Sequence, residues 1–180
     1  MSMNGKYVFE VIKGTFSLAF IKSVVMSYGY FIHEQVTWRK RIHAKKNIRV
    51  HSTASIRNAQ NIYIGENSHI NIHCSVWPGE DSKIILGDNL LMGPGCSLQA
   101  ANHGIFLDEG PMMFQERTQK DIVIGNDVWL GSNVTVTAGA RIADGGICAA
   151  GCVVTKQFDE PNCIIAGIPA RVIGKRKYRK

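Results

Sequence analysis

The chain has 180 residues, of which 45% are hydrophobic and 19% charged, a composition typical of one globular domain and not of a disordered or fibrous protein. Its formal net charge of +7 is uneven, because residues 1–49 and 174–180 are strongly basic whereas residues 50–173 carry more acidic than basic side chains. The basic ends are expected either to be solvated or to meet an acidic lipid, an anionic polymer or a phosphorylated ligand, and we expect no nucleic-acid partner.

Residues 5–32 carry apolar side chains at mixed spacings of three and four, which predicts one helix, or two short helices broken near Gly14 or Gly29. Glu10 and Lys13 interrupt the early apolar stretch, and no cleavage pattern follows it, so we expect a cytoplasmic protein without a secretory signal. The later part of this stretch contains a lysine and two glycines, which makes it short and broken for a transmembrane helix.

A basic connector follows the helical segment at residues 38–49. Two interpretations of the N-terminal region stay open. In the first, which we favour, the helix covers the open end of the repeat body, where strand edges need protection. In the second, the apolar helix and the basic run lie together on a membrane surface, which gives peripheral membrane contact through residues 5–49 at the inner face of the membrane.

Six-residue steps with an apolar first place begin at Val50. The frame slips by two residues after Ile62, and it slips again before Leu86. Slips of this kind mark irregular corners or loops that leave a regular face. Residues 77–83 are expected to form one such loop.

Residues 124–159 contain six successive hexapeptides in one frame, each with Gly, Ala or Thr in its second place. A period of six fits neither an α-helix nor a two-sided strand. It predicts a parallel β-helix with one short strand and one tight corner per hexapeptide, and three faces give a coil of about 18 residues. The predicted fold class is therefore all-β. The first places, expected to point inward, are Ile124, Leu130, Val136, Ile142, Cys148 and Val154.

The five cysteines are an odd number. Cys74, Cys96, Cys148 and Cys152 fall at first or fifth places, which point inward. We interpret them as small buried residues in a reducing compartment and not as a disulfide framework. Because no pair of His or Cys partners has zinc spacing, we expect no metal site.

Residues 101–121 interrupt the repeat between two regular stretches. An insertion between stacked coils has to leave the surface of the solenoid, and such loops often carry function. Since a flat-sided prism has little internal cavity, any ligand site is expected on a projecting loop or between neighbouring prisms. Residues 164–173 are expected to form a last coil or closing strand. The predicted domains are an N-terminal helical and basic segment at 1–49, the repeat body at 50–173 and a basic tail at 174–180.

Four motifs stand in order in the second half of the chain. They are Asn102-His103, Ile124-Gly-Asn-Asp-Val-Trp-Leu-Gly-Ser132, Cys148-Ala-Ala-Gly-Cys-Val-Val-Thr-Lys156 and Ala166-Gly-Ile-Pro-Ala-Arg-Val172. Together they resemble the hexapeptide-repeat acyltransferases, nearest the galactoside, maltose and polysaccharide O-acetyltransferases. The resemblance implies a left-handed parallel β-helix, an exception to the usual right-handed crossover. It also implies acetyl-CoA as cosubstrate, no metal, and a homotrimer with sites between subunits.

His103 resembles the catalytic base of that family. Acetyl transfer from a thioester to an alcohol requires removal of the hydroxyl proton as the oxygen attacks, and an imidazole can take this proton at neutral pH. Asn102, which opens the loop, and Asp81, in the loop at 77–83, are the candidates for binding the acceptor. A solvated turn carboxylate is the alternative interpretation of Asp81.

Six further residues fall where the resembled acetyltransferases line the coenzyme A groove. Small side chains let the pantetheine arm lie against the backbone, and basic side chains can meet phosphates. An exposed indole can pack against the same arm or against a neighbouring subunit. The expected cofactor-binding residues are Trp129, Ser132, Ala150, Thr155, Lys156 and Arg171.

The predicted function is an acetyl-CoA-dependent O-acetyltransferase that acts on a hydroxyl of a sugar or saccharide. The acceptor belongs to a surface polysaccharide, a lipid-linked glycan or a nucleotide sugar. A xenobiotic (antibiotic) O-acetyltransferase is the alternative within the same enzyme class, because it also uses a loop histidine. A non-catalytic or metal-binding β-helix protein is the alternative outside that class.

Overall fold

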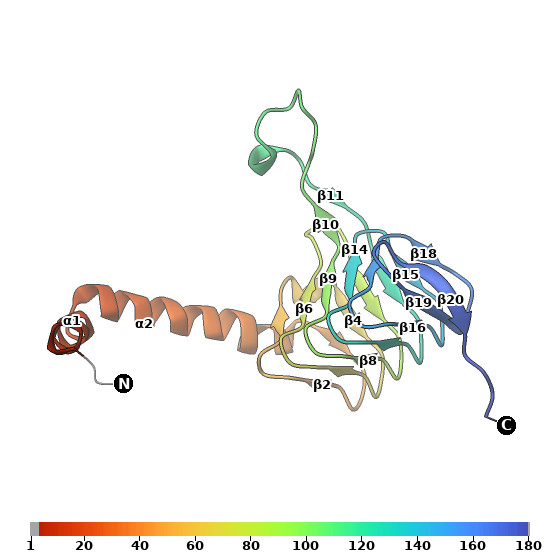
Figure 1. Cartoon of the computed structure of the whole chain (residues 1–180), viewed down its shortest axis with the longest axis horizontal. Coiled ribbons are helices and arrows are strands. Elements are labelled where there is room, and N and C mark those ends of the chain that lie inside the picture. The colour runs from red at the N-terminus through yellow and green to blue at the C-terminus, as the bar shows by residue number, and fades with distance from the viewer. Residues whose placement is uncertain (1–3, 180) are drawn as a thin grey trace.

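The structure is a computed structural model that describes residues 4–179, and its body is a triangular prism of parallel strands (Figure 1). Each of the first five coils visits three sheets in the order A, B, C, and a sixth visits sheets A and B. Sheet A contains β1 (His43–Ala44), β4 (Ile62–Ile64), β7 (Ile84–Leu86), β12 (Ile122–Ile124), β15 (Arg141–Ile142) and β18 (Gln157–Phe158). Sheet B contains β2 (Arg49–Val50), β5 (His69–Ile70), β8 (Leu91–Met92), β13 (Trp129–Leu130), β16 (Ile147–Cys148), β19 (Cys163–Ala166) and β20 (Arg171–Lys175). Sheet C contains β3 (Ser55–Ile56), β6 (Ser75–Trp77), β9 (Ser97–Gln99), β14 (Thr135–Thr137) and β17 (Val153–Val154).

The interior of the prism is a stack of aliphatic side chains that the six-residue period brings into register. Parallel pairing places Leu86, Ile124 and Ile142 side by side in successive coils, and each is at most 2% exposed. All six first places predicted to point inward between residues 124 and 154 are buried, which confirms that prediction. The four cysteines expected inside are buried as well, and they are free thiols, as is Cys163.

Glycines form the corners between sheets A and B, which we call the A–B edge. A Cβ atom on Gly125 would lie 2.3 Å from Asp144 Oδ1, and one on Gly87 would lie 2.5 Å from the backbone of Gly125. Both separations are shorter than any real Cβ contact, so a larger residue would force successive coils apart. This close stacking is the physical reason for glycine in the second place of the hexapeptides that begin at Leu86 and Ile124.

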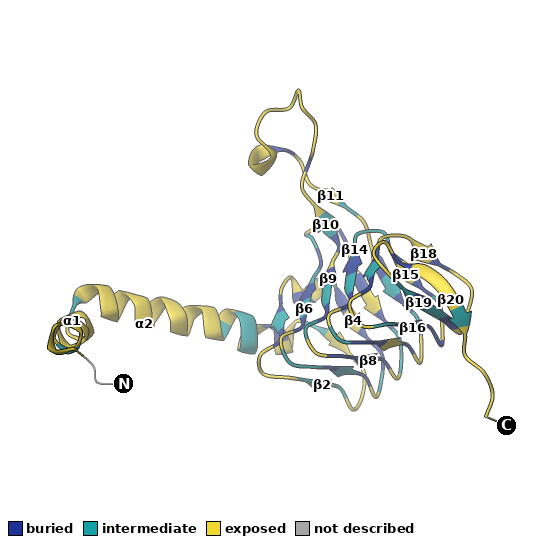
Figure 2. Cartoon of the chain, viewed as in Figure 1, coloured by how far each residue is buried: buried dark blue, intermediate teal, exposed yellow. Residues whose placement is uncertain are grey.

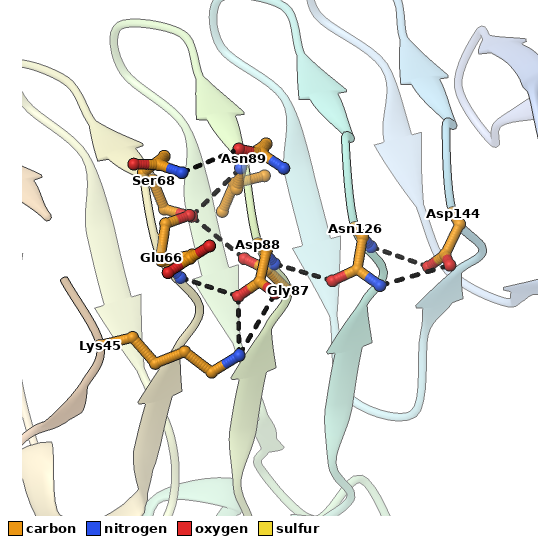
Figure 3. Close-up of polar contacts among 10 residues, drawn as sticks. Lys45, Glu66, Ser68, Gly87, Asp88, Asn89, Asn126 and Asp144 are labelled. Atoms are coloured by element: carbon orange, nitrogen blue, oxygen red, sulfur yellow. Dashed lines mark hydrogen bonds and ion pairs between the residues drawn. The ribbon is translucent and has the colours of Figure 1, made fainter. Parts of the chain in front are cut away.

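A ladder of polar side chains joins successive coils along the A–B edge (Figure 3). The Asp88 N–H donates to Asn126 Oδ1 at 2.8 Å, and the Asn126 N–H donates to Asp144 Oδ1 at 2.7 Å. On its other side, Asp88 Oδ1 accepts from Lys45 Nζ at 3.0 Å and from the Glu66 N–H at 2.8 Å. The bond from Lys45, and then that from Glu66, hold the pKa of Asp88 below its ordinary value.

The N-terminal segment forms α1 (Gly5–Thr15) and α2 (Leu18–Phe31), so the predicted break falls near Gly14. Neither helix contains a buried residue, and both project away from the prism (Figures 1 and 2). The favoured interpretation, that this helix covers the open end of the repeat body, is therefore contradicted. The segment's buried contribution to the core is Trp38, which is 6% exposed. After α2 ends at Phe31, the short helices η1 (Ile32–Val36) and η2 (Thr37–Lys40) lead to the first coil. Trp38 belongs to η2.

Two antiparallel additions complete the fold. Strand β10 (Ala101–Asn102) pairs with β11 (Thr118–Gln119) and raises residues 101–119, here called the arm, out of the prism (Figure 1). This confirms the projecting loop predicted in the insertion at 101–121. Strand β20 pairs antiparallel with β19 and ends sheet B, which is the expected closing strand. No helix among residues 4–179 combines the length and apolarity needed to cross a membrane.

Candidate functional site

The irregularities of the repeat gather at one edge of the prism, where the chain passes from sheet C to sheet A. We call it the C–A edge. In the first five coils the strands of sheets A, B and C follow one another six residues apart, as in Arg141, Ile147 and Val153. The passage from sheet C to sheet A instead takes eight residues from Ser55 to Tyr63 and ten from Ser75 to Ile85. The arm is the largest extension, and it leaves from the same edge.

A groove of about 590 Å³ lies on the C–A edge beneath the arm. A cavity of this size suits a small-molecule ligand. Its lining is mostly polar and combines amides, guanidinium groups, one indole and one imidazole. The lining residues are Arg57, Asn58, Trp77, Pro78, Gly79, Glu80, Gln99, Ala101, Asn102, His103, Arg117 and Gln119.

His103 enters this groove from the arm, directly after β10. The loop behind it is held by Gln115, which is 7% exposed. The Gln115 amide accepts from the Phe106 N–H at 2.9 Å and donates to the carbonyl groups of Phe106 and Gly110, both at 2.7 Å. A Cβ atom on Gly104 would lie 2.6 Å from Gln115 Cβ, so a glycine is needed next to the histidine. The arm thus has a polar core of its own that fixes the start of its loop.

Trp77 and Arg57 form a stacked pair in the groove. The Arg57 guanidinium carbon lies 4.1 Å from the centroid of the Trp77 ring, close enough for a cation–π contact. Arg57 Nε also donates to Glu34 Oε1 at 2.9 Å, while Trp77 Nε1 donates to Ser55 Oγ at 2.9 Å. Ser55 in turn bonds to the other carboxylate oxygen of Glu34. This closed network fixes the position of the indole.

Asp81 lies beside the groove and reaches it through Gln119. The Asp81 N–H donates to Gln119 Oε1 at 3.0 Å, and Gln119 Nε2 donates to Asp81 Oδ2 at 3.2 Å. Gln119 lines the groove, whereas the lining contributed by the loop at 77–83 includes Glu80 and not Asp81. Of the two predicted acceptor-binding residues, the structure therefore places Asn102 in the groove and Asp81 behind Gln119.

A second hollow of about 510 Å³ lies on the other side of the arm, along the same edge. It contains Thr155 and Lys156, two of the six residues expected to bind the coenzyme. Lys120 and Arg141 add positive charge to its lining, and Arg141 faces Asp159 at 3.6 Å. The arm therefore separates two neighbouring hollows. The first contains Asn102, which is expected to bind the acceptor, and the second contains Thr155 and Lys156, which are expected to bind the coenzyme.

The other four expected coenzyme residues lie elsewhere on the chain. Trp129, in β13 of sheet B, is 49% exposed. Ser132 and Ala150 follow β13 and β16 at the corner between sheets B and C, which we call the B–C edge. Arg171 begins β20 and is exposed, and its guanidinium donates to the Ala170 carbonyl at 2.9 Å. A single prism does not bring these residues together with Thr155 and Lys156.

Several residues of the groove were absent from the sequence prediction, namely Arg57, Asn58, Trp77, Gln99, Arg117 and Gln119. Register is the signal that identifies two of them. Trp77 pairs with Gln99, and each follows an inward first place, so both point outward at the C–A edge, Gln99 just before the arm and Trp77 one coil earlier. Gln99 can be identified as the last outward residue before the arm, and Trp77 by counting back one coil from it.

Within residues 4–179, no group of three or more His, Cys, Asp or Glu side chains is arranged to hold a metal ion.

Comparison with curated proteins identifies similar acetyltransferases, although no family model matches the chain. It is 36% identical over 115 residues to the galactoside O-acetyltransferase of Escherichia coli, a match that covers 63% of this chain and 53% of the relative. It is 33% identical over 124 residues to the putative lipopolysaccharide biosynthesis O-acetyltransferase WbbJ of Escherichia coli, covering 65% and 62%. The chain thus spans between half and two thirds of the length of these relatives.

Comparison with solved structures identifies the same architecture over most of the chain. A galactoside acetyltransferase in complex with coenzyme A superposes with a TM-score of 0.72 and 24% sequence identity, covering 89% of this chain and 84% of that protein. The likeness confirms the predicted left-handed parallel β-helix.

Proposed function

This chain belongs to the hexapeptide-repeat acyltransferase family, and from that premise we propose that it transfers the acetyl group of acetyl-CoA to a hydroxyl of a saccharide. The observation that carries the proposal is the position of His103 in the wall of a polar groove. The relatives named as galactoside and lipopolysaccharide O-acetyltransferases support a saccharide acceptor.

The lining of the groove supports a saccharide as the acceptor. Amide side chains such as Asn58, Gln99 and Gln119 can both donate hydrogen bonds to sugar hydroxyls and accept them. The Trp77 indole supplies an apolar surface for the carbon face of a sugar ring. Asn102 stands next to His103 and is proposed to orient the hydroxyl that reacts. Asp81 is proposed to act through Gln119, whose amide it holds.

His103 is proposed as the general base. Its imidazole takes the proton of the acceptor hydroxyl while that oxygen forms a bond to the thioester carbonyl carbon. The carbon–sulfur bond then breaks, and the imidazolium returns the proton to the leaving sulfur. The products are an O-acetyl saccharide and a free thiol, and the histidine regains its initial state.

Coenzyme binding is proposed to require more than one copy of the chain. Thr155 and Lys156 lie on the C–A edge, whereas Ser132 and Ala150 lie on the B–C edge, at the other side of sheet C. In a homotrimer, the C–A edge of one subunit faces a different edge of its neighbour, so one cleft can collect residues from both. Trp129 and Arg171, which are exposed in sheet B, complete this proposed binding set.

The test is release of free thiol from acetyl-CoA by the purified chain, in the presence of galactosides, maltose, nucleotide sugars or chloramphenicol. We expect transfer to a saccharide, and a kcat about 10² to 10⁴ times lower for His103→Ala with coenzyme A binding retained, because a general base contributes about that factor. His51→Ala, which removes an exposed imidazole outside the groove, is the matched control and should keep full activity.

Three results would contradict the proposal. Equal turnover of His103→Ala removes the histidine from the mechanism. Lack of any coenzyme A binding removes the enzyme itself. Acetylation of chloramphenicol without acetylation of any saccharide assigns the chain to the xenobiotic acetyltransferases. Sedimentation equilibrium tests the trimer separately.

A further inference from the structure

The N-terminal helices leave a large apolar surface in contact with water. Fourteen large apolar side chains in α1, α2 and the turn between them are 46 to 86% exposed, and no residue between 4 and 31 is buried (Figure 2). An exposed apolar surface of this extent marks an interaction site. The side chains are Tyr7, Phe9, Val11, Ile12, Phe16, Leu18, Phe20, Ile21, Val24, Val25, Met26, Tyr28, Tyr30 and Phe31.

The distribution of these side chains differs between the helices. In α1, Lys6, Glu10 and Lys13 share one face through their spacings of four and three, and the rest of the surface is mainly apolar. In α2, apolar residues occur on nearly every side, and Lys22 is the single charged side chain. A helix that is apolar nearly all round belongs in an apolar environment, and an amphipathic helix beside it suits the boundary between lipid and water.

The length of the helices excludes one mode of membrane binding. Helix α2 has 14 residues, which gives about 21 Å at 1.5 Å per residue, whereas the hydrocarbon core of a bilayer is about 30 Å thick. Within residues 4–179, no helix is suited to crossing a membrane. In a bilayer, α1 and α2 are therefore expected to enter only one leaflet, from its surface.

The positive charge of the N-terminal segment favours a lipid surface of negative charge. Glu10 is the only acidic residue before Glu34, and the Glu34 carboxylate is already held by Arg57 and Ser55. The basic residues among residues 1–49 are Lys6, Lys13, Lys22, Arg39, Lys40, Arg41, Lys45, Lys46 and Arg49, of which Lys45 is already paired with Asp88. An anionic headgroup layer attracts such a segment. A second copy of the chain carries the same positive charge in the same place, which disfavours helix-to-helix pairing between copies.

We propose that α1 and α2 bind the surface of an anionic lipid bilayer, with their apolar side chains among the upper acyl chains and their lysines at the lipid phosphates. The aromatic side chains of Tyr28 and Tyr30 suit the headgroup level, where amphipathic rings are enriched. At the base of α2, the bonds from Glu34 to Arg57 and Ser55 join the helical segment to the first coil. Because Arg57 also lines the groove, the bound protein holds the groove close to the lipid surface.

The test is sedimentation of the full chain with vesicles. We expect the chain to sediment with vesicles that contain phosphatidylglycerol and phosphatidylcholine, and to partition at least tenfold less into vesicles of phosphatidylcholine alone. Phe16→Asp combined with Leu18→Asp should lower partitioning into the anionic vesicles at least tenfold, because both side chains are more than 80% exposed at the turn between the helices. Lys13→Gln combined with Lys22→Gln should lower it without changing the apolar surface.

Ile173→Asp combined with Tyr178→Asp is the matched control. It places two acidic residues at exposed apolar positions outside the helices and should keep vesicle binding. Circular dichroism and coenzyme A binding establish that each variant is folded, independently of acceptor chemistry. Absence of sedimentation with anionic vesicles, or unchanged sedimentation of Phe16→Asp with Leu18→Asp, overturns the proposal. It is equally overturned if the lipid-free chain forms an assembly that this substitution dissolves while the vesicles remain unbound.

Discussion

Trp77 connects the groove with the segment that precedes the prism. One face of its ring is stacked on Arg57, and its Nε1–H is held by Ser55, so the indole has little freedom to move. A fixed aromatic ring favours a ligand with a flat apolar face, and binding then costs little side-chain entropy. The residue is therefore expected to contribute to acceptor binding and not to the proton transfer.

Trp77→Ala should raise the KM for the saccharide about two- to tenfold, because an aromatic contact is worth about 0.5–1.5 kcal/mol, and it should leave the KM for acetyl-CoA unchanged. Trp77→Phe keeps a smaller aromatic ring and loses the bond to Ser55, so its KM for the saccharide should lie between those of Trp77→Ala and the unsubstituted protein. Initial rates at varied concentrations of each substrate measure the effect. A change confined to kcat would show that the indole acts in another step.

Asp88 makes the stability of the prism depend on pH in a defined direction. Its folded-state pKa is lowered, first by the hydrogen bond from Lys45 and then by the Glu66 N–H. The ionised form is thus favoured in the folded state. Its contribution to stability is fully present above the unfolded-state pKa of about 3.9, and it is lost as the pH falls through the lowered folded-state value.

Asp88→Asn should destabilise the protein at pH 7, and the difference from the unsubstituted protein should shrink as the pH falls below about 4. Urea unfolding at pH 7, 5, 4 and 3 measures it. Asp108→Asn, which removes an exposed carboxylate of the arm, is the control and should leave the stability unchanged at every pH. A constant difference between Asp88→Asn and the unsubstituted protein over this range would exclude the ionised carboxylate as its cause.

Among the elements, the arm combines a weak connection to the prism with an organised interior. At its base, β10 pairs with β11 and Gln119 bonds with Asp81 of the prism, and further out Gln115 links Phe106 and Gly110. His103 sits at the point where these two parts meet. Its position therefore depends on the interior of the arm more than on the core of the prism.

Gln115→Ala should lower kcat about tenfold or more, since a small displacement of a catalytic group has a large effect on rate. The melting temperature should change little, because the arm lies outside the hydrophobic core. Gln115→Glu keeps the oxygen that accepts from the Phe106 N–H and should recover part of the rate. Hydrogen exchange of residues 104–117 reports on the arm directly. Faster exchange without a lower kcat would separate the order of the arm from catalysis.

The regular elements could be predicted from the sequence, whereas the N-terminal helices could not be placed. A period of six predicts that residues such as Ile124 and Leu130 point inward. Each of them pairs with an equivalent inward residue in an adjacent coil. The apolar pattern of residues 5–32 predicts helices equally well for a buried cap and for a surface-bound segment. The lack of buried residues in α1 and α2 excludes the buried cap, and that burial cannot be read from the apolar pattern.

At the scale of the whole molecule, the candidate site combines residues that a sequence motif identifies with residues that no motif identifies. His103 and Asn102 belong to a motif, and they lie in the groove. Trp77 and Arg57 belong to coils whose repeat is irregular, so their approach to His103 depends on strand register and is invisible to local motifs. The assembly of the coenzyme residues, and the domain boundaries at residues 49 and 173, stay predictions.

In the first five coils the length changes are confined to the C–A edge, which has a consequence for how such a protein diverges. Residues added there leave the spacing of the strands in every later coil unchanged, as the arm itself demonstrates between β9 and β12. Descendants of one ancestor can therefore lengthen, shorten or replace loops at this edge while inheriting the same interior. A change in the groove then needs no refolding of the body, and we expect related sequences to keep the corner glycines while their loops at this edge differ.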